Sequence, residues 1–222
     1  TGALALPQVS DAFARLHEAA HAMRHPARKG QMRVSCAPSF AAKWLAPRLH
    51  RFEASHPDIQ VWIGASVGLV NFHADPADLA IRFGAGVYDG LKARKLLSET
   101  VIPVCAPRLL DGSNPVLRPE DLRQLTLLHD EGQENDPSCP NWRQWLKARG
   151  ETGIDTSRGP RFDQTSVALE AAVAGRGVLL AKRMIALNDI NSGRLIMPFP
   201  GGGVDIDFAY WAVWPKARTQ TA

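Results

Sequence analysis

The sequence of 222 residues has little cysteine and no long hydrophobic run. Its three cysteines are an odd number, which argues against a framework of disulfide bonds. No apolar stretch approaches the roughly 20 residues that a membrane-spanning helix needs. The first residues also lack the charged and then apolar pattern of a secretion signal. We therefore expect a cytoplasmic protein with reduced thiols and no membrane partner.

The common sequence signatures of enzymes are missing as well. There is no Gly-x-Ser-x-Gly elbow and no phosphate-binding P-loop, and the seven histidines are scattered. The segment 84–90 resembles a dinucleotide-binding loop only loosely, because its third glycine comes one residue late. The triplet His129-Asp130-Glu131 has no neighbours at metal-ligand spacing. We expect no catalytic residue, no cofactor and no metal.

Composition and charge are those of an ordinary globular protein. Hydrophobic residues make up 45% of the chain, and the formal net charge of +4 raises the question of DNA binding. Most basic residues are interleaved with acids, and the one concentrated basic patch lies within residues 24–33. That patch either contacts DNA or is a solvated joint between two segments. We expect the chain by itself to bind DNA weakly or not at all.

The first half of the chain alternates between strand and helix signals. Residues 32–37 form a short apolar run, and residues 59–63 alternate with period two. Between them Ser39, a preferred N-cap residue, predicts a helix start, and Pro47 predicts a bend or an irregular first turn. Residues 78–84 give another strand that ends in glycine. This order predicts a doubly wound parallel sheet with its binding crevice at the carboxyl ends of the strands.

The second half of the chain repeats this alternation. Pro119 and Asn141 are suited to the first turn and the cap of two helices. Residues 126–129 and 178–181 are apolar strand candidates, and residues 208–214 give a last strand. The whole chain is therefore predicted to be of the α/β class.

Near the N-terminus, six apolar residues recur at spacings of three and four. This stripe predicts a helix over residues 1–25 with a coiled-coil period, which favours pairing with a second copy of the chain. Packing of the helix on its own domain is the alternative. The stripe consists of Leu6, Val9, Phe13, Leu16, Ala20 and Met23.

Several segments, in this order and spacing, resemble the effector-binding domain of LysR-type transcriptional regulators. The branch is similar to that of the glycine-cleavage activator and the β-lactamase regulator. The resemblance covers nearly everything from about residue 33 to residue 215. It is carried by residues 34–49, 56–59, 78–84, 104–107, 126–130, 160–163 and 174–178.

The resemblance implies a two-lobed fold like that of periplasmic binding proteins, with mostly parallel sheets, preceded by a linker helix. The implied division is a linker and dimerisation helix over 1–25, lobe I over 26–102, lobe II over 103–197, and a return to lobe I with a C-terminal tail over 198–222. It also implies a homo-oligomer, a dimer or a tetramer, that contacts promoter DNA through a winged helix-turn-helix preceding this chain. A small effector between the lobes would relay its presence to that domain.

Hydroxyl groups at two predicted helix starts are the strongest candidates for effector binding. Ser39 would cap one helix and Thr165 or Ser166 another, and helix N-termini favour anions, so a carboxylate between the lobes would touch both. Each hydroxyl could instead only cap its own helix. Together with the contacts that the resemblance implies, the predicted ligand-binding residues are Ser39, Phe40, Ser66, Phe83, Gly84, His129, Asp130, Asp163, Thr165 and Ser166.

Two residues bear on the kind of effector. Asn71 stands where the β-lactamase-regulator branch usually has an acidic residue, which argues against a muropeptide-like effector. Arg82 is suited to clamp a carboxylate through its paired donors, and equally to pair with Asp78.

Two other classes of protein remain alternatives to a regulator. A solute-binding receptor of the same two-lobe fold is the first, and the coiled-coil stripe and the free cysteines count against it. An enzyme on the same scaffold is the second, and the missing catalytic groups count against it. The reading frame upstream of Thr1 would discriminate between these classes.

Overall fold

The computed structural model describes residues 30–68, 70–72, 77–110, 118–133, 136–199 and 201–216. The predicted helix over residues 1–25 and its coiled-coil stripe lie outside the described residues. Within these ranges no helix is long and apolar enough to cross a membrane.

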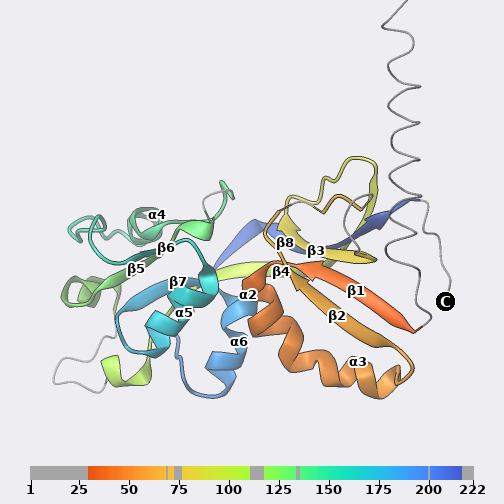
Figure 1. Cartoon of the computed structure of the whole chain (residues 1–222). Coiled ribbons are helices and arrows are strands. Elements are labelled where there is room, and N and C mark those ends of the chain that lie inside the picture. The colour runs from red at the N-terminus through yellow and green to blue at the C-terminus, as the bar shows by residue number, and fades with distance from the viewer. Residues whose placement is uncertain are drawn as a thin grey trace, which may run out of the picture.

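One mixed sheet of eight strands organises the molecule, in the order β2-β1-β3-β8-β4-β7-β5-β6 (Figure 1). We call its two flanks lobe I and lobe II. Lobe I contains the parallel strands β2 (Gln60–Ala65), β1 (Gln31–Cys36) and β3 (Leu79–Gly84). Lobe II contains the parallel strands β7 (Val178–Lys182), β5 (Leu127–Asp130) and β6 (Arg161–Phe162). The predicted α/β class is confirmed.

Two long strands join the lobes. They are β4 (Leu91–Val104) and β8 (Val204–Pro215), which pair with each other in antiparallel fashion. β8 also pairs with β3 of lobe I, and β4 pairs with β7 of lobe II, again antiparallel. The pairing of β4 with β8 shifts register between Lys95 and Leu97 and between Ser98 and Glu99. Both strands thus pass through the middle of the sheet, and the exact lobe boundaries at 102/103 and 197/198 stay a prediction.

The helix after β1 is irregular, as Pro47 predicts. It consists of α2 (Pro38–Phe40), a π-helical turn (Ala41–Leu45), a 3₁₀ turn (Ala46–Arg48) and α3 (Leu49–Ser55). Proline has no N–H, so it cannot donate to the carbonyl of Lys43 four residues earlier. Asn188 Nδ2 of a distant helix donates to that carbonyl instead, at 2.7 Å. A tertiary contact therefore satisfies the backbone group that the proline leaves open.

The helices of lobe II begin where their sequences favour a start. Figure 1 shows α5 (Thr165–Val173) and α6 (Arg183–Asn191) on the same side of the sheet as α2 and α3, and α4 (Trp142–Lys147) on the other side. Asn141 caps α4 as predicted, because its Oδ1 accepts from Gln144 N at 3.0 Å and the Gln144 side chain accepts from Asn141 N at 2.8 Å. Pro119 begins a 3₁₀ helix (Pro119–Gln124). Two further 3₁₀ turns cover Pro107–Leu109 and Glu131–Gln133.

Two hydrophobic clusters form the core. The larger cluster includes residues of both lobes, so it ties them together; among its members are Val34, Phe40, Leu128, Leu169 and Tyr210. The smaller cluster fills lobe II around Trp142, Trp145 and Leu146.

The three cysteines are free thiols, and burial raises the pKa of each. The pKa of Cys36 and of Cys105 is about 11, and both residues are buried in strand segments as the sequence predicts. The pKa of Cys139 is about 12. All three are therefore poor nucleophiles at neutral pH.

Candidate functional site

The two lobes contact each other at the carboxyl ends of their parallel strands. Ser39 follows β1 in lobe I, and Ser166 lies in the first turn of α5 in lobe II. The backbone N–H of Ser166 donates to Ser39 Oγ at 3.0 Å. The predicted meeting of these two helix starts is therefore present, with the Ser166 amide as the group that reaches Ser39.

The predicted capping roles of these hydroxyls are wrong. Ala37 is the N-cap of α2 and Pro38 is its first residue, so Ser39 lies inside the helix. Gln164 is the N-cap of α5, without a side-chain capping bond, and Thr165 is the first helical residue. Ser39 thus faces the other lobe instead of its own helix. Thr165 Oγ1 donates to Asp130 Oδ2 at 2.7 Å.

The end of β5 brings His129 and Asp130 to the same edge. Asp130 Oδ1 accepts from the backbone N–H of Gly132 at 3.1 Å, in addition to its bond from Thr165. The Nε2 atom of His129 lies 2.9 Å from the carbonyl oxygen of Arg158, within hydrogen-bond distance. Both predicted residues therefore have protein partners.

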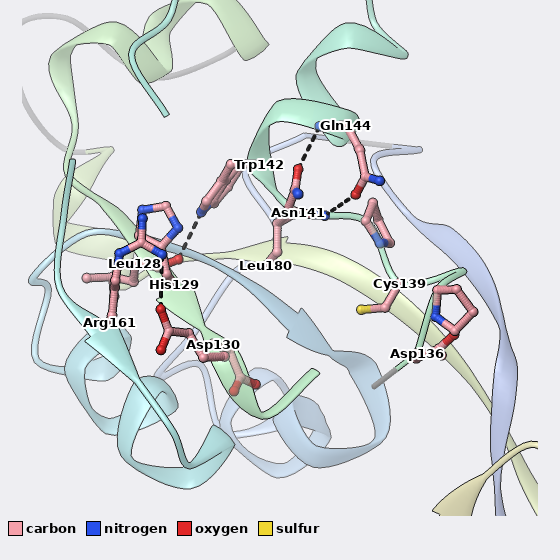
Figure 2. A pocket seen from close by; sticks show the side chains of 13 residues that line it. Leu128, His129, Asp130, Asp136, Cys139, Asn141, Trp142, Gln144, Arg161 and Leu180 are labelled. Carbon is pink, nitrogen blue, oxygen red and sulfur yellow. Dashed lines mark hydrogen bonds and ion pairs between the residues drawn. The ribbon is translucent and has the colours of Figure 1, made fainter. Parts of the chain in front are cut away.

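A cavity of about 350 Å³ opens beside this edge, entirely within lobe II (Figure 2). Its wall combines the end of β5, the start of β6, and the segment from Asp136 to the first turn of α4. Trp142 forms part of the wall and is fixed by its Nε1, which donates to the carbonyl of Leu128 at 2.9 Å. The wall carries acidic residues as well as one arginine, Arg161, which pairs with Glu131 at 3.0 Å. The cavity has the size of a small-molecule site.

The remaining predicted residues lie around this region in different environments. Phe40 is buried in the core, stacked on Trp44 and next to Tyr210. Ser66 follows β2 and is exposed, and its backbone N–H donates to the carbonyl of Cys36 at 2.8 Å. Phe83 and Gly84 form the end of β3. Asp163 is exposed and lies just before α5.

Three polar residues that the sequence reasoning missed lie where the crossing strands pass between the lobes. We call Glu99 of β4, Lys182 of β7 and Tyr210 of β8 the cleft floor. Glu99 is 2% exposed, and its Oε1 accepts from the backbone N–H groups of Thr100 at 2.9 Å and Met184 at 3.1 Å. Its Oε2 is buried without a hydrogen-bond partner among the described residues. Burial raises the pKa of Glu99.

Lys182 brings a positive charge into the same region. It is 5% exposed, and its Nζ lies 4.1 Å from the centroid of the Phe83 ring. Burial lowers the pKa of Lys182, while nearby Asp130 and Glu99 act in the opposite direction. The pKa of Tyr210 is raised well above its usual value by burial, by the charges of Glu99 and Asp130, and by a hydrogen bond with the Glu99 side chain. Of the three residues, only Glu99 could have been noticed in the sequence, because it is a charged residue between two apolar strand segments.

A second group of charges joins the lobes away from the cleft floor. We call Lys43, Glu170, Asp189 and Arg194 the lobe clamp. Lys43 Nζ lies 2.5 Å from Glu170 Oε1 on α5 and 3.1 Å from Asp189 Oδ2 on α6. Asp189 is fully buried and also pairs with Arg194. The π-helical turn of lobe I is thus ion-paired to two helices of lobe II.

Other groups that could carry chemistry have structural partners. Arg82 is buried and donates to the carbonyl and the Oγ of Ser35 and to the carbonyl of Ile81, which braces β3 against β1. Within the described ranges, no three His, Cys, Asp or Glu side chains are placed to hold a metal ion.

The family model described as "LysR substrate binding domain" matches residues 25–222. The chain belongs to the LysR substrate-binding domain family. Among curated relatives, the glycine cleavage system transcriptional activator of Escherichia coli K12 is 38% identical over 191 residues, which is 86% of this chain and 61% of the relative. The HTH-type transcriptional activator AmpR of Rhodobacter capsulatus is 33% identical, over 86% of this chain and 62% of the relative. The LysR domain therefore spans about three-fifths of the length of the curated relatives that it matches.

Solved structures agree with this membership. The effector domain of AmpR from Pseudomonas aeruginosa superposes with a TM-score of 0.68 at 29% identity, covering 87% of this chain and 89% of the other. The effector-binding domain of AmpR from Citrobacter freundii gives a TM-score of 0.69 at 27% identity, covering 87% and 92%. The predicted family, its branch and the two-lobed fold are confirmed. The curated relatives named above are transcriptional regulators, in line with the expectation that the LysR domain is regulatory.

Proposed function

We propose that this LysR domain senses a small effector in the cleft between its lobes and controls a DNA-binding regulator. The observation that carries the proposal is the direct bond from Ser166 N to Ser39 Oγ, which joins the lobes just after the carboxyl ends of β1 and β6. A ligand that enters at this point changes the contact between the lobes, and a ligand with different affinity for two arrangements shifts their populations. The cavity of about 350 Å³ in lobe II is lined in part by Asp130, the residue that Thr165 of α5 binds.

The effector in this proposal carries a carboxylate. Ser39 offers its hydroxyl hydrogen, and Thr165 can offer its own by giving up its bond to Asp130. The N-terminus of α5 offers backbone amides and the favourable end of its dipole. The full set of proposed ligand-binding residues is the one predicted from the sequence: Ser39, Phe40, Ser66, Phe83, Gly84, His129, Asp130, Asp163, Thr165 and Ser166.

The proposed setting is a homo-oligomer in the cytoplasm, bound to promoter DNA through a winged helix-turn-helix outside this chain. The coiled-coil stripe over residues 1–25 supports self-association, and membership of a family of transcriptional regulators supports the DNA partner. The LysR domain alone should then sediment as a dimer or larger. A monomer at every accessible concentration would contradict this part of the proposal.

The site is tested by removing one hydroxyl at a time. A carboxylate found by thermal-shift screening should raise the melting temperature, since a ligand that binds only the folded state stabilises it. Ser39→Ala and Thr165→Ala should each weaken its binding roughly tenfold to a hundredfold, the usual effect of losing a hydrogen bond to a charged group. Calorimetric titration of both variants and the parent measures the change.

Ser55→Ala is the matched control, because the Ser55 hydroxyl donates to the carbonyl of Arg51 on an exposed helix of lobe I. Its affinity for the carboxylate should equal that of the parent. Unchanged affinity in both variants would show that the Ser39 hydroxyl serves only the contact between the lobes and the Thr165 hydroxyl only its bond to Asp130.

A further inference from the structure

Lys182 is the one residue of the cleft floor that carries a positive charge. It ends β7, in register with Val101 of β4, at the place where the sheet passes from one lobe to the other. The ring under its ammonium belongs to Phe83 of lobe I. The carboxylates that influence it most from lobe II are those of Asp130 and Asp136. Its head group therefore lies between the lobes.

Each carboxylate near Lys182 already accepts hydrogen bonds from other groups of the chain. Asp130 is bound by Thr165 Oγ1 and Gly132 N, and Glu99 by two backbone amides. Asp136 Oδ1 accepts from the backbone N–H and the Oγ of Ser138, at 2.9 and 2.6 Å. These bonds hold the three acidic side chains in place around the ammonium.

The Lys182 ammonium has no hydrogen bond and no ion pair to any described residue. It lies against the face of the Phe83 ring, and Asp130, Cys139, Glu99 and Asp136 act on it electrostatically from further away. A cation placed over an aromatic ring gains some attraction. That attraction does not replace the water that the ammonium gives up at 5% exposure, and burying an ionised group without an acceptor is costly. An oxygen acceptor from outside the chain would remove this cost.

We propose that Lys182 selects the effector by its charge, with the ammonium binding a carboxylate oxygen of the ligand at the cleft floor. This inference rests on the proposed function and adds to it the residue that distinguishes an acid from its neutral and basic analogues. The surrounding carboxylates favour the charged form of Lys182 and repel an anion at every other point of the floor. An acid can therefore bind only where it reaches the ammonium.

The test compares the binding of small molecules that have nearly the same shape but a negative, neutral or positive head group. Butanoate, butanamide and butylamine form one set, and phenylacetate, phenylacetamide and phenethylamine form a second. The carboxylate of at least one set should raise the melting temperature of the parent, and its amide and amine should not. Inorganic phosphate is added as a second anion, to separate recognition of a carboxylate from recognition of a phosphate.

Lys182→Met keeps the length of the side chain and removes its charge. Butanoate or phenylacetate should bind this variant roughly tenfold to a hundredfold more weakly. Without any ligand, the variant should melt at a higher temperature than the parent, because an unpaired buried ammonium has been replaced by an apolar group. A purely structural lysine that pairs with the nearby acids predicts the opposite, a lower melting temperature. Lys147→Met, on the exposed side of α4, is the control and should change neither quantity.

The outcomes separate the two proposals. Carboxylate binding that survives Lys182→Met, or a ligand-free variant that melts below the parent, overturns the role of Lys182 and leaves effector sensing intact. Binding of only the amides, only the amines or only phosphate to the parent also overturns charge selection of a carboxylate. Failure of every probe in both sets to bind the parent counts against the proposed function and against this inference together.

Discussion

Charged side chains join the lobes at two places, and only one of them is internally satisfied. In the lobe clamp, Lys43 pairs with two carboxylates, and the buried Asp189 has both Lys43 and Arg194 as partners. In the cleft floor, Glu99 Oε2 has no hydrogen-bond partner among the described residues, and Lys182 has a ring face and nearby acids but no ion pair within those residues. Both regions carry a buried carboxylate, so burial alone does not explain the difference.

The difference separates a structural junction from a binding surface. Paired charges hold two elements in one geometry, whereas unsatisfied buried groups destabilise the fold and persist where function requires them. The clamp should therefore lose stability when one of its groups is neutralised. The floor should gain stability when one of its groups is neutralised, and lose the response to ligand. These opposite signs can be measured.

The largest effect is expected at the centre of the clamp. Asp189→Asn leaves the guanidinium of Arg194 and the ammonium of Lys43 without their shared buried carboxylate. Breaking a buried pair by removing one partner typically costs about 3 kcal/mol. Urea unfolding of the variant and the parent measures the loss. Asp205→Asn, a change at an exposed position on β8, is the control and should stay within about 0.5 kcal/mol of the parent.

A smaller effect of the opposite sign is expected at Glu99. Because its pKa is raised in the folded state, the folded protein binds a proton more tightly than the unfolded chain, whose Glu has a pKa near 4.5. Stability from this group therefore falls as the pH rises from about 4.5 through the folded pKa. Glu99→Gln should abolish that fall and be more stable than the parent at neutral pH, by about 1 kcal/mol. Unfolding curves across the acid to neutral range check it.

Equal stability of the Gln variant and the parent at neutral pH would mean that Glu99 has a donor for its second oxygen in solution. A variant less stable than the parent would show that the charge of Glu99 stabilises the fold, as the charges of the lobe clamp do.

The smallest effect on stability is expected at Glu170, the exposed member of the lobe clamp. Glu170 has a lowered pKa because of its hydrogen bond from Lys43, but its side chain is 57% exposed. Its contribution is present above the unfolded pKa and is lost as the pH falls through the folded pKa. Glu170→Gln should cost less than about 0.5 kcal/mol, and the difference should shrink in high salt. A loss as large as that of Asp189→Asn would show that the two carboxylates act as one unit.

The positions of Ser39 and Asp130 at strand ends were predictable from the sequence, and the bonding of the Ser39 and Thr165 hydroxyls was not. Strand signals before Ser39 and Asp130 put both residues at carboxyl ends, where parallel strands open a crevice. The capping prediction failed because Pro38, whose fixed φ suits the first helical position, starts α2 one residue before Ser39. Pro47, by contrast, acts through its own missing N–H, so its local effect was predictable and is confirmed.

Lys182 and the lobe clamp lay beyond sequence reasoning for a different reason. Lys182 follows an apolar run and looks like an ordinary strand end with a solvated side chain. Its burial depends on Phe83, nearly one hundred residues earlier in the chain, and on acids from other strands. Lys43 likewise meets partners on α5 and α6 that no local pattern connects to it. Contacts between distant segments are set by the topology of the sheet.

The antiparallel pairing of β4 with β8 has a mechanical consequence. Two strands bonded along most of their length resist bending apart, but their twist can change where their register shifts, and one of the two shifts adjoins Glu99. We therefore expect the lobes to move relative to each other by a change of strand twist and not by opening about a free hinge. An effector at the floor would change this twist by a small angle, and the far ends of the molecule would carry the displacement.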